Sequence, residues 1–104
     1  MAWAVLVVSG VLEAVWAAAL DRSDGFRRLG PTVLFAVALT ASMGGLAFAM
    51  RDLPLGTAYA VWVGIGATLT VAYGMIFDGD PATPLRMLFL ALIVGGIVGL
   101  KALA

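Results

Sequence analysis

The residue with the clearest capacity for chemistry is Glu13, within the stretch VLEAVWAA at positions 11–18. Residues 2–20 around it are otherwise apolar or small. An ionised carboxylate at membrane depth costs about 3 kcal/mol, so such a group takes up a proton or pairs with a cation. Glu13 is therefore a candidate site for proton–cation exchange. The alternative is a protonated, structurally inert glutamate that faces another helix.

Several polar side chains have the spacing to join Glu13. Trp16 follows it by one helical turn, and its indole N–H could donate a hydrogen bond to the carboxylate. Tyr59 and Trp62 share a helix face, where they could wall a cation site or serve only as packing or interfacial anchors. Ser42 is isolated in its segment, and an isolated serine usually bonds to the backbone of its own helix.

The composition places these residues in a membrane. The chain has 104 residues, of which 63% are hydrophobic and 12% charged. Soluble domains average about 45–50% apolar and about 25% charged residues, so the class is an integral membrane protein. The net charge of zero gives no basic surface for nucleic acid, and the absence of cysteine and histidine removes thiol chemistry and the usual transition-metal ligands. We expect neither a cofactor nor a metal.

Four segments are long and apolar enough to cross a bilayer, at residues 2–20, 32–50, 55–77 and 85–103. The joins between them hold most of the charged residues, which is typical of a polytopic helical protein. Pro31, Pro54 and Pro84 are expected at first helical positions, and Thr83 as an N-cap. The sequence predicts an all-α protein with a single four-helix transmembrane domain over residues 1–104.

The distribution of basic residues gives only a weak orientation. Joins one and three lie at one end of the helices with Arg22, Arg27, Arg28 and Arg86, against Arg51 and Lys101 at the other. Four against two is a small bias under the positive-inside rule, so insertion in both orientations stays open. Four helices alone hardly enclose a gated pathway, which predicts at least a dimer. Gly95 and Gly99 form a small-residue face in the last segment that suits helix–helix contact.

The chain resembles the small multidrug resistance family of proton-coupled cation exporters over nearly its full length. The resemblance rests on the Glu13 segment, on SDGFRRLGP, on LPLGTAYAVWVGIG at positions 53–66 and on the terminal GGIVGLKAL. The chain resembles the guanidinium exporter subtype of this family in having a tryptophan, Trp16, three residues after the glutamate. Drug-exporting members typically have glycine there. The resemblance implies a transporter rather than an enzyme, a multi-pass protein of the bacterial inner membrane that works as an antiparallel, dual-topology dimer.

The resemblance also implies roles for individual residues. Glu13 matches the carboxylate that binds substrate and proton in competition. Trp16, Ser42 and Tyr59 match its hydrogen-bonding partners, and Trp62 matches a pocket aromatic. Gly95 and Gly99 match the part of the last helix that dimerises.

The implied activity is export of guanidinium and small guanidinyl cations in exchange for protons. The alternatives are export of quaternary ammonium or other lipophilic cations by the same fold and, more remotely, a non-transporting membrane subunit or scaffold. Asp21 and Asp80 depart from the usual residues of the family's joins, which leaves open whether the chain pairs with itself or with a homologous subunit.

Overall fold

The computed structural model describes residues 1–103 and contains four helices. They are α1 (Ala2–Arg22), α2 (Leu29–Ala49), α3 (Leu55–Phe77) and α4 (Pro84–Leu103). Each is long and apolar enough to cross a membrane, since 20 residues of α-helix span about 30 Å. Residues 1–103 contain no β-strand, and the prediction of an all-α protein with four membrane-spanning helices is confirmed.

The helix starts follow the local sequence signals in part. Pro84 is the first residue of α4, as predicted, and the Thr83 hydroxyl accepts a hydrogen bond from the Arg86 backbone N–H at 3.2 Å, which confirms the N-cap. The expected positions of Pro31 and Pro54 were wrong, because Pro31 is the third residue of α2 and Pro54 precedes α3. Neither position costs a hydrogen bond, since N–H groups of the first turn have no acceptor within the helix.

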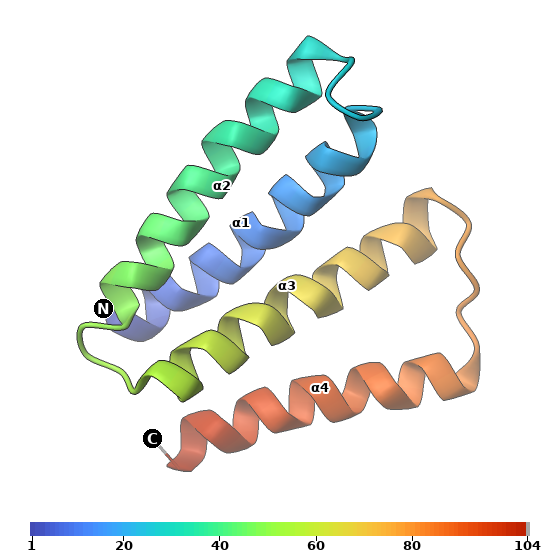
Figure 1. Cartoon of the computed structure of the whole chain (residues 1–104). Helices are drawn as coiled ribbons and strands as arrows, with labels where there is room; N and C mark the ends of the chain where they lie inside the picture. Colours follow the sequence, from blue (N-terminus) through green and yellow to red (C-terminus); the bar gives the residue numbers. More distant parts are fainter. Residues whose placement is uncertain (104) are drawn as a thin grey trace.

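The helices form an open layer in the order α2, α1, α3, α4 (Figure 1). Helix α1 packs along both α2 and α3, whereas α2 and α3 meet only briefly and α4 packs on α3 alone among the described helices. The chain measures 42 × 35 × 17 Å along its principal axes, and the shortest dimension is less than two helix diameters. No residue of α4 through Leu103 is buried, so most of this helix is open to lipid or to another protein.

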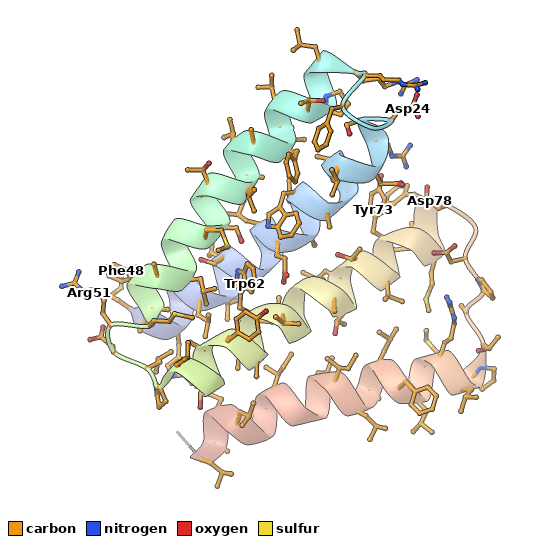
Figure 2. All side chains as sticks on the ribbon, in the orientation of Figure 1. Asp24, Phe48, Arg51, Trp62, Tyr73 and Asp78 are labelled. Carbon is orange, nitrogen blue, oxygen red and sulfur yellow. The ribbon has the colours of Figure 1, made fainter. Side chains whose placement is uncertain are left out.

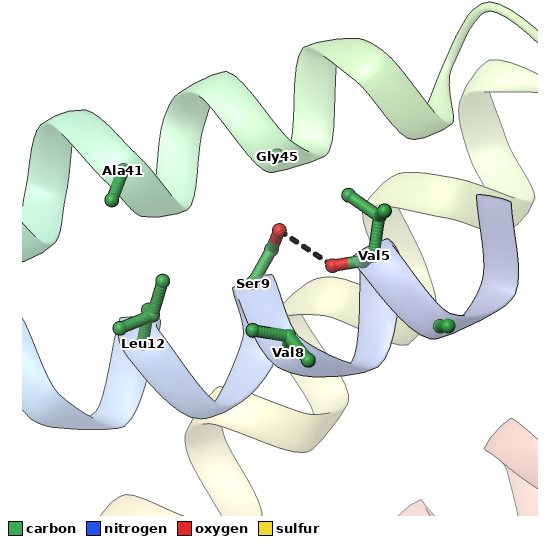
Figure 3. Close-up of a pocket in the computed structure, with 7 residues that line it drawn as sticks. Val5, Val8, Ser9, Leu12, Ala41 and Gly45 are labelled. Atoms are coloured by element: carbon green, nitrogen blue, oxygen red, sulfur yellow. Dashed lines mark hydrogen bonds between the residues drawn. The ribbon is translucent and has the colours of Figure 1, made fainter. Parts of the chain in front are cut away.

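Small residues bring α1 close to its two neighbours. Ser9 is buried against α2, where its hydroxyl donates to the Val5 carbonyl at 2.7 Å, and a Cβ placed on Gly45 would overlap that hydroxyl (Figure 3). On the other side, a Cβ on Gly10 would lie 2.8 Å from the Cβ and Cγ2 atoms of Ile65 in α3. Neighbouring residues of α1 therefore set its distance to α2 and to α3.

The two ends of the layer are held differently. At the end where α1 starts and α2 meets α3, buried apolar residues form the core cluster: Leu6, Leu46, Ala49, Ala58, Val61 and Trp62. At the other end Arg22 joins α1 to α3, donating from Nε to the Tyr73 hydroxyl at 2.8 Å and from Nη2 to Asp78 Oδ1 at 3.1 Å. Tyr73 and Asp78 are labelled in Figure 2. This ion pair is exposed, and exposed pairs contribute less than about 1 kcal/mol. Apolar packing therefore contributes more than this ion pair to holding the helices together.

The adjacent glycines of α2 test the close approach of α1. Gly45→Ala is expected to lower the free energy of unfolding by about 1–3 kcal/mol, because the added methyl group overlaps Ser9. Gly44→Ala is the matched control, since a Cβ there meets nothing within 4 Å, and it should raise the same free energy by up to about 1 kcal/mol. Unfolding titrations in mixed micelles, followed by circular dichroism, would compare them. Equal stability of the two variants would contradict this packing.

Candidate functional site

Glu13 lies midway along α1, in a groove between α1 and α3. The groove has a volume of about 320 Å³. It is lined by Glu13, Trp16, Ala17, Val63, Gly66, Ala67, Thr70 and Val71. Only three of these side chains carry polar atoms, and the Thr70 hydroxyl is already committed to the Gly66 carbonyl at 2.6 Å. The groove therefore presents one carboxylate and one indole N–H to an otherwise apolar space.

Gly66 makes room for the carboxylate. A Cβ built on this buried glycine would overlap Glu13 Oε1 and would lie 2.8 Å from Glu13 Cγ. Gly66 lies four residues after Trp62, one helical turn along the same face of α3, and this spacing alone gives no sign of a contact with Glu13. The structure thus adds Gly66 to the site.

The polar atoms of Glu13 and Trp16 have no partners within the described residues. Glu13 Oε1 and Trp16 Nε1 are both buried, and neither makes a hydrogen bond. The predicted bond from Trp16 to Glu13 is thus not made in this single chain, although both residues line one groove. A buried donor or acceptor without a partner costs about 1–3 kcal/mol. An unpaired acceptor and an unpaired donor in one groove indicate a place for a ligand.

Ser42 belongs to a second polar group, which is satisfied. Its fully buried hydroxyl donates to the Ser9 carbonyl of α1 at 2.7 Å and accepts from the Trp62 indole N–H at 3.1 Å. The expectation that this serine bonds to its own helix was wrong, because α1 packs closely enough on α2 to bring the Ser9 carbonyl within hydrogen-bond range. These bonds tie α1, α2 and α3 together, and Trp62 extends from α3 toward the other two helices (Figure 2).

Tyr59 extends this second group toward the outside. Its ring lies against Trp62 with centroids 5.9 Å apart and an interplanar angle of 35°. Tyr59 is 53% exposed, so it stands at the edge of the single chain. The structure therefore brings Glu13 together with Trp16, and Ser42 with Trp62 and Tyr59, but the second group does not line the groove of the first. The hydrogen-bond network around Glu13 stays a prediction.

The glycines predicted to mediate dimerisation lie on an open face of α4. A Cβ on Gly95 or Gly99 would meet no atom within 4 Å. A contact with a second chain stays a prediction. Residues 1–103 hold no group of three or more histidine, cysteine or acidic side chains that could bind a metal. The expectation that no cofactor is needed also stays a prediction.

Four helices of membrane-spanning length, with one unpaired carboxylate between two of them, define a small polytopic membrane protein with an acidic intramembrane site. The family model described as Small Multidrug Resistance protein matches residues 1–93, and the chain belongs to this family. The resemblance inferred from the motifs is thereby confirmed.

Relatives with assigned activities match nearly the whole chain. A protein named Guanidinium exporter from Escherichia coli (strain K12) is 52% identical over 101 residues, covering 97% of this chain and 96% of the relative. Guanidinium exporters from Yersinia pseudotuberculosis (strain IP32953) and Proteus vulgaris are 52% and 50% identical, each covering 97% of both chains. The chain is a transport protein rather than an enzyme, and a multi-pass protein of the bacterial inner membrane.

The contact between Gly66 and Glu13 can be tested without measuring transport. Gly66→Ala is expected to lower the free energy of unfolding by about 1–3 kcal/mol, because its methyl group overlaps the Glu13 side chain. In a Glu13→Ala background the overlap is gone, so the same substitution should cost much less. Gly56→Ala, whose Cβ meets nothing within 4 Å, is the control and should behave alike in both backgrounds. Additive effects of Gly66→Ala and Glu13→Ala would contradict the contact.

Proposed function

We propose that this protein is a proton-coupled antiporter that exports guanidinium and small guanidinyl cations across the bacterial inner membrane. The observation that carries the proposal is the buried, unpaired Oε1 atom of Glu13 beside the unpaired indole N–H of Trp16. The relatives named Guanidinium exporter support the substrate class. Transport would proceed by alternating access around Glu13.

The chemistry of the groove suits a small planar cation. Guanidinium has paired N–H donors that match a carboxylate in a bidentate arrangement. An aromatic ring beside the cation adds about 0.5–2 kcal/mol, with the larger values where water is excluded. Trp16 supplies both a ring and an N–H that can hold the carboxylate in one orientation. A single carboxylate in an apolar groove holds either a proton or a cation, and this competition couples their movements.

The proposed transporter is a dimer of two copies of the chain, or of this chain and a homologous subunit. The layer is open, and α4 presents Gly95 and Gly99 without neighbours, which suits contact with another α4. Tyr59 is half-exposed and packs against Trp62, whose indole N–H donates to Ser42. We expect the Tyr59 hydroxyl to hydrogen-bond a carboxylate across such a dimer. With two identical copies inserted in opposite orientations, the inward-open and outward-open states are the same structure with the roles of the subunits exchanged. A homodimer then populates both equally by symmetry. A pair formed with a homologous subunit has no such symmetry.

Replacing the Glu13 carboxylate tests whether this residue couples proton movement to guanidinium transport. Glu13→Gln is expected to abolish proton-driven guanidinium transport, because an amide neither releases a proton nor neutralises the cation. Asp24→Asn is the matched control, since it removes a carboxylate from the first join, and asparagine tolerates the positive φ of this position. Both proteins would be reconstituted in liposomes and their transport currents recorded, with thermal unfolding as the check on folding. Proton-driven transport by folded Glu13→Gln would remove Glu13 from the mechanism.

Substrate choice tests the role of Trp16. Guanidinium and methylguanidinium should give currents in liposomes, and tetrapropylammonium little or none, because a quaternary ammonium has no N–H for the carboxylate. Trp16→Gly is expected to lower the guanidinium current at least about fivefold, the effect of losing about 1 kcal/mol of hydrogen bonding. Current with tetrapropylammonium alone would contradict the guanidinium assignment and favour export of quaternary ammonium compounds.

A further inference from the structure

We propose that Phe35 of α2 is a positioning residue for Trp16, and that Phe26 of the first join holds Phe35 in place. Three aromatic rings then run from the membrane surface to the groove, and their packing fixes the ring that selects the planar cation. The consequence for selectivity rests on the proposed function. The positioning of the ring does not.

Within the single chain, packing sets the orientation of the Trp16 ring. Its indole N–H makes no hydrogen bond, so no polar contact within the chain holds the ring in one rotamer. The core cluster lies on one side of it. On another side Phe35 meets it nearly at right angles, with ring centroids 6.0 Å apart and an interplanar angle of 76°. Edge-to-face contact is a favoured geometry of aromatic pairs, and this contact gives the ring a preferred orientation.

Phe35 is held in turn from the first join. The rings of Phe26 and Phe35 have centroids 5.7 Å apart and an interplanar angle of 60°. Phe26 lies in the left-handed region with φ of +70°, after Asp24 at +50° and Gly25 at +67°. Glycine adopts this conformation freely, but a bulky aromatic residue rarely does. The backbone is thus strained at the residue whose ring contacts Phe35.

Buried Ser23 maintains this strained turn. Its hydroxyl donates to the Leu20 carbonyl at 2.7 Å and accepts from the Phe26 backbone N–H at 3.1 Å. Its carbonyl accepts from the backbone N–H groups of Arg27 and Arg28 at 2.8 and 3.0 Å. Strained conformations persist where surrounding contacts determine them, and they tend to occur at functional positions. Here the contacts of one serine direct a phenylalanine ring onto the ring that supports Trp16.

The test follows Trp16 directly. The chain has three tryptophans, so incorporation of 5-fluorotryptophan gives three ¹⁹F resonances, and Trp16→Phe assigns the one of interest. Phe35→Leu is expected to broaden the Trp16 resonance by releasing the ring. Phe26→Leu should also broaden it, although Phe26 forms a ring pair with Phe35 and not with Trp16. Phe35→Tyr keeps an aromatic ring and should restore a sharp line. Phe89→Leu on α4, where Phe89 is 54% exposed, is the control.

Transport provides the second readout. In Phe35→Leu the ratio of guanidinium to tetrapropylammonium current should fall about tenfold, since a small displacement of a binding group has effects on this scale. A sharp Trp16 resonance in both Phe35→Leu and Phe26→Leu would overturn the proposal, even with an altered current ratio. A broadened resonance in a protein whose parent does not transport guanidinium would support the positioning role and refute the proposed function.

Discussion

The carboxylate of Glu13 needs a volume that only a residue without a side chain leaves free, and the rest of the site depends on this constraint. Gly66 leaves that volume on α3, so α1 and α3 can pack with an acidic group between them. The approach of α1 to α3 is set one turn earlier on α1, where Gly10 leaves room for Ile65. If α1 lay farther from α3, the groove would open to lipid. If it lay closer, no space would remain for a cation or a proton donor.

Two kinds of buried polar group follow from this packing, and they serve different ends. Ser9, Ser42 and Trp62 are hydrogen-bonded across three helices, which rigidifies the frame and commits the Ser42 O–H and the Trp62 N–H within the chain. Glu13 and Trp16 keep an acceptor and a donor unsatisfied within the chain. An unsatisfied buried group is costly. A ligand that hydrogen-bonds to these groups removes this cost. The free energy regained in this way adds to the affinity for the ligand.

The sequence was sufficient for the helices and for the central acid, because apolar length and an isolated charge are local signals. Contacts between helices were not predictable in the same way. These helices are apolar around nearly their whole circumference, so no polar face marks how each is rotated against its neighbour. The contact of Gly66 with Glu13, the bond from Ser42 to Ser9 and the link from Arg22 to Asp78 all depend on that rotation. The left-handed backbone at Phe26 was not predictable either, because a positive φ is expected from sequence mainly at glycine.

An even number of crossings places the start of α1 and the end of α4 at the same end of the layer (Figure 1). A gene duplication that joined two copies head to tail would therefore insert both with the same orientation. An opposed pair encoded in one polypeptide requires an odd number of additional spans between the copies. Two separate chains can insert in opposite orientations without such a span. A tandem fusion designed to reproduce the proposed antiparallel pair must carry a fifth helix in its linker.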